Sequence, residues 1–101
     1  MGYSVSRHSD PARKLYSYKK SLRRLQGTVK SGETSSHVFK SAEKVRQAAL
    51  ALIKAKRSLI EEYPERDPDK RHEHNLLEEE QRWLALSPEE IAKEYGKTED
   101  A

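Results

Sequence analysis

The fold is decided by residues 36–63, which read SHVFKSAEKVRQAALALIKAKRSLIEEY. A seven-residue repeat of large aliphatic side chains runs through this stretch: Val38, Val45, Leu52 and Leu59. This spacing places them on one face of a helix, which Pro64 ends. Small side chains flank the repeat, at Ala42, Ala48, Ala49 and Ala55, and they allow a second helix to approach closely. The stretch therefore predicts a long helix that packs against a neighbour in an antiparallel hairpin.

The segment before it predicts the partner helix, over residues 11–26. Asp10 followed by Pro11 is a helix start signal, because a proline at the first helical position lacks an N–H that would be unpaired anyway. The apolar face of this helix holds Leu15, Tyr18, Leu22 and Leu25. We expect Gly27 to end the helix in a left-handed conformation. Residues 27–36, rich in Ser, Thr and Gly, then form a loop.

The chain beyond Pro64 predicts two more helices, over residues 68–86 and 88–95. Asp67-Pro68 and Ser87-Pro88 repeat the start signal, and Ser87 with Glu90 forms a capping box. We expect Gly96 to cap the last helix with the left-handed backbone that suits glycine. The apolar side chains of these two segments are Leu76, Leu77, Trp83, Leu84, Ile91 and Tyr95.

Together these elements predict an all-α fold, a three-helix bundle built on the helical hairpin, with a short fourth C-terminal helix. A length of 101 residues predicts a single small helical domain over residues 1–101. We expect residues 1–9 and 97–101 to be flexible. The apolar core is thin for this length, which leaves a homo-oligomer open. No apolar run approaches the roughly 18 residues of a membrane span, so we expect no membrane partner.

Two charged residues interrupt the predicted core. Lys56 falls at the same helical angle as Val38, and Glu80 falls among the apolar side chains of the third helix. Long charged side chains at such positions either reach water at the edge of a core or pair with each other across the helix interface. The sequence leaves both alternatives open.

Charge is strongly segregated along the chain. Residues 1–57 hold 14 Lys and Arg against three acids, a net of +11, whereas residues 58–101 hold six against 14, a net of −8. Such asymmetry indicates an anionic partner for the basic half. In the alternatives, the two halves neutralise each other within a monomer or across a dimer, or the charges merely solvate helix faces.

The basic half predicts nucleic-acid binding. Residues 13–30 contain seven Lys and Arg and no acid, and such residues bind phosphates by releasing the condensed counterions of the polyanion. Tyr16 lies among them and is placed to stack on a base. The predicted nucleic-acid-binding residues are Arg13, Tyr16, Lys19, Lys20, Arg23, Arg24, Lys30, Arg46, Lys54 and Arg57.

The sequence thus predicts a small non-enzymatic protein that binds the phosphate backbone of DNA or RNA through a basic helical face. The alternative is a helical protein–protein adaptor or assembly subunit that docks its partners by its bipolar charge. We expect a cytoplasmic or nucleoid-associated location. The basic, Ser-rich first 26 residues also resemble a transit peptide, which leaves an organelle open.

No catalytic chemistry is indicated by the sequence. The chain has no cysteine, which excludes disulfides, thiolate zinc sites and cysteine nucleophiles. His72 and His74 are two residues apart and point to opposite sides of a helix, so they cannot share a metal ion there. No phosphate loop, nucleophile elbow or zinc-protease motif occurs. We therefore expect no enzyme activity, no catalytic residue, no metal and no cofactor.

Overall fold

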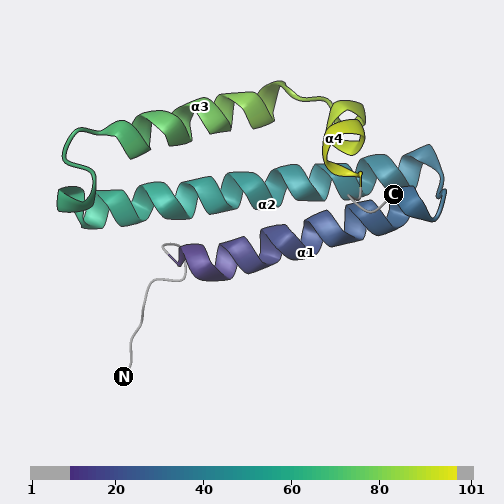
Figure 1. Cartoon of the computed structure of the whole chain (residues 1–101), viewed down its shortest axis with the longest axis horizontal. Coiled ribbons are helices and arrows are strands. Elements are labelled where there is room, and N and C mark those ends of the chain that lie inside the picture. Colours follow the sequence, from purple (N-terminus) through teal and green to yellow (C-terminus); the bar gives the residue numbers. More distant parts are fainter. Residues whose placement is uncertain (1–9, 98–101) are drawn as a thin grey trace.

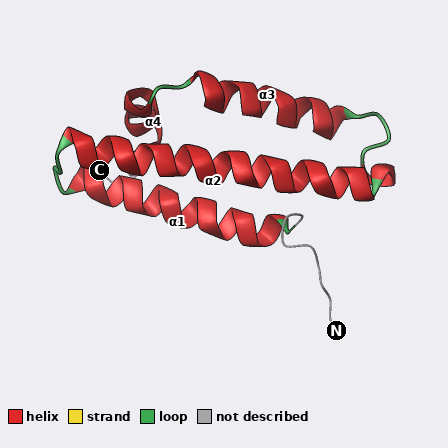
Figure 2. Ribbon diagram, turned by 180° about the vertical axis from the view of Figure 1, so that it is seen from behind, coloured by secondary structure: helices red, strands yellow, loops and turns green. Residues whose placement is uncertain are grey.

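The computed structural model describes residues 10–97, and within them it contains helices and no strand. The elements in chain order are α1 (Pro11–Lys30), α2 (Ser35–Glu62), a 3₁₀ turn η2 (Pro64–Arg66), α3 (Arg71–Ala85) and α4 (Pro88–Tyr95). Figure 2 shows the connections between them as short loops. The expected all-α fold built on a helical hairpin is confirmed. The expectation for residues 1–9 and 98–101 lies outside the described residues.

The long helix α2 is the centre of the arrangement (Figure 1). Helix α1 runs antiparallel along one side of α2, and α3 lies along the other side. Helix α4 sits at one end, where it packs on α2 and also contacts α1. The three longer helices therefore lie side by side, with α2 in the middle.

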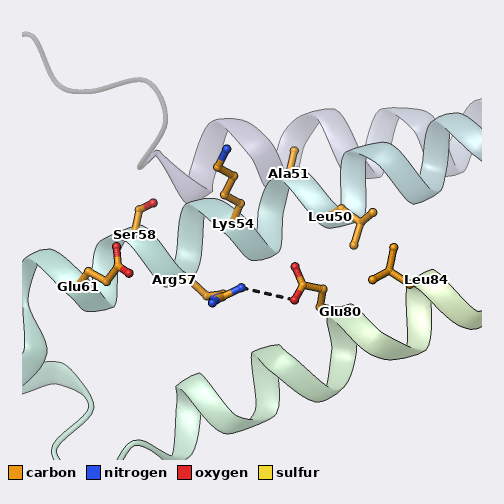
Figure 3. Close-up of a pocket in the computed structure, with 8 residues that line it drawn as sticks. All are labelled: Leu50, Ala51, Lys54, Arg57, Ser58, Glu61, Glu80 and Leu84. Carbon is orange, nitrogen blue, oxygen red and sulfur yellow. Dashed lines mark hydrogen bonds and ion pairs between the residues drawn. The ribbon is translucent and has the colours of Figure 1, made fainter.

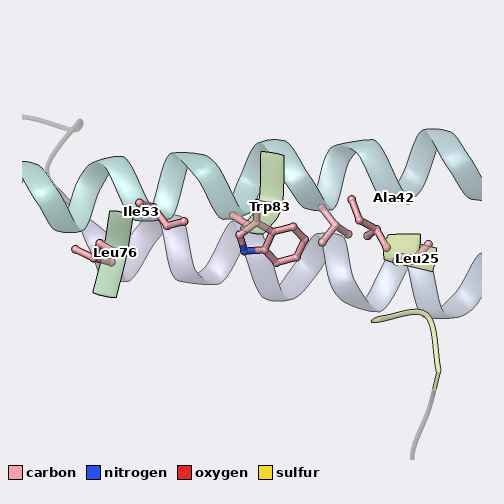
Figure 4. Packing of buried hydrophobic residues seen from close by; sticks show 8 residues of the cluster. Leu25, Ala42, Ile53, Leu76 and Trp83 are labelled. Carbon is pink, nitrogen blue, oxygen red and sulfur yellow. The ribbon is translucent and has the colours of Figure 1, made fainter. Parts of the chain in front are cut away.

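The core lies where α1, α3 and α4 meet on α2 (Figure 4). Trp83 of α3, only 4% exposed, is its largest side chain. Its ring makes an edge-to-face contact with Tyr18 of α1, at 6.1 Å between centroids, and stacks on Tyr95 of α4 at 4.8 Å. Aromatic pairs at these separations attract each other beyond the area that they bury. One indole thus joins three helices.

The predicted apolar faces are largely confirmed. Leu25, Val45, Leu52, Leu76 and Ile91 are all buried. The exceptions are Leu15 of α1, which is 38% exposed, and Leu77 and Leu84 of α3, which are 39% and 55% exposed. A single helix packed against one side of α2 buries only a narrow stripe, and Leu76 and Trp83 occupy it.

The predicted end of the first helix is wrong. Gly27 lies inside α1, and Gly32 adopts the left-handed backbone instead, with φ 69°. The N–H groups of Gly32 and Glu33 donate to the carbonyls of Val29 and Thr28, the pattern of a Schellman cap. Because one internal glycine costs a helix only about 1 kcal/mol, the helix continues to this cap. The true loop is residues 31–34.

The predicted start of the third helix is also displaced. Helix α3 begins at Arg71, three residues after Pro68, and Lys70 adopts a positive φ of 58° in the turn before it. The buried Asp67 still acts as its cap. Its two carboxylate oxygens accept hydrogen bonds from the backbone N–H groups of His72, at 2.9 Å, and Glu73, at 3.1 Å. An aspartate side chain can therefore cap the first N–H groups of a helix across a turn, as well as from the position directly before the helix.

The last helix matches its predicted bounds, and the capping box of Ser87 and Glu90 is present. Gly96 caps it, but with a right-handed φ of −84° rather than the left-handed one expected. A methyl group at Gly96 would clash with the backbone carbonyl oxygen of Ala92 and would lie 2.9 Å from Val29 Cγ2. The glycine is therefore needed both at the end of α4 and for the close approach of α4 to α1.

The two charges that interrupt the predicted core do not pair with each other. Lys56 is exposed to solvent, as the first alternative predicts. Glu80 instead lies 3.4 Å from the guanidinium of Arg57. The alternative in which Lys56 pairs with Glu80 is therefore wrong. Arg57, the next residue of α2, pairs with Glu80 instead.

Candidate nucleic-acid interface

All seven predicted residues of α1 are exposed, but they do not lie on one face. At 100° per residue, Lys20 and Arg24 lie on the side of α1 that borders α2. Lys19, Arg23 and Lys30 lie on the opposite flank of the exposed surface, away from α2. Only the first of these two rows can act together with side chains of another helix.

The row beside α2 forms one wall of a groove. Two adjoining hollows, of about 290 and 200 Å³, lie between α1 and α2 and share Arg24, Ser41 and Lys44. We call them together the basic groove. Its lining residues are Ser17, Lys20, Ser21, Arg24 and Thr28 from α1, and His37, Lys40, Ser41 and Lys44 from α2.

The basic groove carries uncompensated positive charge. No acid lines it. Among residues 10–97, Lys20, Arg24, Lys40 and Lys44 have no carboxylate oxygen within 4.0 Å. The same holds for the other lysines of this part of the chain, so the groove is distinguished by bringing four such cations together. The nearest acid to the lining is Glu33, whose Oε1 lies 2.9 Å from Nδ1 of His37 at one end. The groove therefore presents its cations to solvent or to an anionic ligand.

The spacing of these cations suits an extended anion. Lys20 and Arg24 are one helical turn apart on one wall, and Lys40 and Lys44 are one turn apart on the other. Each pair is thus separated by about 6 Å along its helix axis. Ser17 and Ser21 of α1 and Ser41 of α2 also line the groove, and hydroxyl groups can donate hydrogen bonds to phosphate oxygens. The cations on the two walls can therefore contact successive phosphates of one strand from both sides.

The three predicted residues of α2 are not brought into this groove. The Arg46 side chain, 18% exposed, lies 3.5 Å from Glu43 and donates to the backbone carbonyl of Leu86. Arg57 is held by Glu80. Both side chains lie on the side of α2 that faces α3 and its connection to α4. There they bind the carbonyl of Leu86 and the carboxylate of Glu80.

Lys54 is exposed and lines a different hollow, between α2 and α3 (Figure 3). This hollow has a volume of about 540 Å³. Two cations, Lys54 and Arg57, and two acids, Glu61 and Glu80, line it together with Leu50 and Leu84. Its charges balance, so it offers no attraction to a polyanion.

Lys40 and Lys44 are the groove cations that the sequence prediction left out. Lys40 and Lys44 line the groove because their flank of α2 packs beside α1. The sequence of α2 alone does not show which of its two flanks does so. The available signal is the spacing. Lys40 and Lys44 repeat at four residues, as Lys20 and Arg24 do, and both pairs flank an apolar stripe.

No protein-family model matches this chain, and no curated protein or solved structure is detectably similar to it. Within residues 10–97, none of the helices combines the length and the apolar character needed to cross a bilayer. The function is therefore argued from the basic groove itself.

Proposed function

We propose that this chain is a small, non-enzymatic protein that binds the phosphate backbone of nucleic acid in the basic groove. The observation that carries the proposal is the pairing of Lys20 and Arg24 of α1 with Lys40 and Lys44 of α2 across a groove that no acid lines. Cations without carboxylate partners gain most from a polyanion, because binding releases its condensed counterions and breaks no internal ion pair. A cytoplasmic or nucleoid-associated location belongs to the same proposal.

The charge of the remaining surface also favours binding of a polyanion on the side that α1 and α2 share. Residues 58–101 carry a net charge of −8, and the described part of this segment contains the end of α2, the turn η2, α3 and α4. A polyanion is repelled from that side and attracted to the side that α1 and α2 share. Backbone contacts of this kind carry no sequence information, so we expect little discrimination among base sequences.

A matched pair of charge reversals tests the groove. The first variant carries Lys20→Glu, Arg24→Glu and Lys44→Glu, and the second carries Lys19→Glu, Arg23→Glu and Lys30→Glu. Both reverse three exposed cations, but only the first set lines the groove. In mobility-shift titrations at several salt concentrations, the first variant is expected to lose two to three units of the slope of log affinity against log salt, at about 0.9 per phosphate contact. The second should lose at most one.

Two results would count against this proposal. Equal losses in both variants would mean that binding is spread over the whole of α1. Undetectable binding by the wild-type protein at low salt would overturn the nucleic-acid function. Far-UV circular dichroism of each variant separates a lost contact from a lost fold.

The alternative of a protein–protein adaptor or assembly subunit has one observation in its favour. Leu77 and Leu84, seven residues apart on α3, are both exposed, and Leu84 lines a hollow together with Leu50 of α2. Exposed leucines at this spacing suit a partner helix. Under this alternative the wild-type protein binds no nucleic acid near physiological salt, and the first triple variant loses a protein partner instead.

A further inference from the structure

A third hollow, separate from the basic groove, lies at the end of the molecule where α1 begins and α2 ends. It has a volume of about 570 Å³ and shares no residue with the basic groove. Four elements converge on it: the first residue of α1, the last two turns of α2, the turn η2, and the first half of α3. We call it the end pocket.

The end pocket has an apolar floor. Leu59 and Ile60 of α2 and Leu76 of α3 line it, and Pro11 of α1 closes one side. Leu76 is buried, whereas Leu59 and Ile60 remain half-buried because no further helix covers them. Half-buried aliphatic side chains gain from an apolar group that displaces water from them.

The rim of the end pocket is cationic. Lys56 of α2, Arg66 of η2 and the imidazole of His72 of α3 line it, with Glu79 as the single acid. Among residues 10–97, Lys56 and Arg66 have no carboxylate oxygen within 4.0 Å. The guanidinium of Arg66 lies over the ring of Tyr63, 5.3 Å from its centroid, in a cation–π contact.

This concentration of cations runs against its surroundings. Residues 58–101 hold 14 acids and only six Lys and Arg. One of these six, Arg66, meets Lys56 of the basic half at the same hollow. Both side chains are exposed, so their charges are available to a ligand in the hollow.

We propose that the end pocket binds a small amphipathic anion, with its apolar body on Leu59, Ile60 and Leu76 and its carboxylate between Lys56 and Arg66. Ligand pockets combine a mostly apolar lining with a few placed polar groups, in volumes of about 300–1,000 Å³. The apolar floor supplies burial, and the two cations select the sign of the charge. This site is independent of nucleic-acid binding.

Two probes of opposite charge test this site on the full chain. These are 1-naphthoate and 1-naphthylmethylammonium, which share a ring system and differ in the charge of the head group. In amide-resolved NMR titrations, naphthoate is expected to produce saturable shifts in residues 56–60, 66 and 72–76. The ammonium probe should bind at least tenfold more weakly. Equal binding of the two probes, or shifts scattered over the whole molecule, would overturn the proposal.

A pair of double variants tests the rim. Lys56→Gln with Arg66→Gln is expected to lower the affinity for naphthoate about tenfold, the loss typical of charge-assisted hydrogen bonds. Lys54→Gln with Lys93→Gln removes the same charge from exposed positions outside the end pocket and should leave the affinity unchanged. Glu79→Gln should raise it, because the only acid of the rim is removed. Equal losses in both double variants would show that net charge alone attracts the probe.

Discussion

Arg46 lies in the basic half of the sequence, yet its guanidinium belongs to the interior of the fold. It donates to the carbonyl of Leu86, lies near Glu43, and keeps its buried Nε without a partner among the described residues. Sequence reasoning assigned it to nucleic acid because charge alone does not distinguish a cation that faces solvent from one that ties two helices together. The difference depends on the residues of α3 and α4 that lie opposite.

Arg46→Met is therefore expected to lower the free energy of unfolding by about 1–3 kcal/mol, since the carbonyl of Leu86 loses its charged donor. Urea denaturation measures this loss. The affinity for nucleic acid should stay within twofold of the wild-type value in the mobility-shift assay. Unchanged stability together with weakened binding would show that Arg46 contacts nucleic acid.

The titration of Asp67 is linked to the stability of the fold. Burial by itself raises the pKa of this carboxyl, but hydrogen bonds from the backbone N–H groups of His72 and Glu73, with the nearby His72 ring, outweigh burial. The net pKa of Asp67 lies below its ordinary value. The charged form therefore stabilises the fold above the unfolded-state pKa of about 4, and this contribution is lost as the pH falls through the lower folded-state pKa.

Asp67→Asn is expected to lower the melting temperature at pH 7, because the amide is a weaker acceptor for the first N–H groups of α3. The gap between the melting temperatures of wild type and variant should narrow as the pH falls from about 4 through the lower folded-state pKa of Asp67, below which the folded wild-type carboxyl is neutral as well. Glu65→Gln, an exposed acid of the same turn, is the control and should show no such gap. Thermal melts from pH 2 to 7 decide the matter, and a constant gap at all pH values would contradict this account.

At the scale of elements, the sequence predicted the number and type of the helices but misplaced two of their ends. The seven-residue repeat of α2 and the capping box of α4 are local signals, and both were interpreted correctly. The end of α1 was not, because Gly27 and Gly32 both suit a left-handed cap in isolation. The continued turn places Val29 beside Gly96, a contact with α4 that no local pattern reveals.

The two glycines provide a direct test. Gly27→Ala is expected to stabilise the protein by about 0.5–1 kcal/mol, because this position is helical, exposed and open around a new Cβ. Gly32→Ala is expected to destabilise it by about 1–2 kcal/mol, because a side chain at its φ of 69° is strained. Thermal denaturation of both variants measures the pair. Changes of the same sign would show that the helix end is misplaced.

At the scale of the whole molecule, the candidate site was half predictable. Lys20 and Arg24 follow from the charge of the first helix and its apolar face. Their partners Lys40 and Lys44 do not, because the choice between two flanks of α2 is made by packing. The core that makes this choice is held together at Trp83, where α1, α3 and α4 meet.

Trp83→Ala is expected to cost about 3–5 kcal/mol, the usual loss for a buried indole. Since small domains have only about 5–15 kcal/mol of stability in total, the variant should melt far below the wild type or lose its cooperative transition. Trp83→Phe keeps an aromatic ring and should lose less. Circular dichroism melts compare the three proteins, and an unchanged melt for Trp83→Ala would mean that α3 adds little to the fold.

The position of α4 also sets the order in which this molecule opens and closes. Helices α1 and α2 are joined by four residues, so their hairpin forms from neighbouring parts of the chain. By contrast, the amide of Gln26 in α1 donates to the carbonyl of Tyr95, 69 residues away, at 3.4 Å. Contacts between such distant parts of a chain form late during folding. We therefore expect the contact of α4 with α1 to form after the hairpin and its basic groove have formed, and to be lost before them.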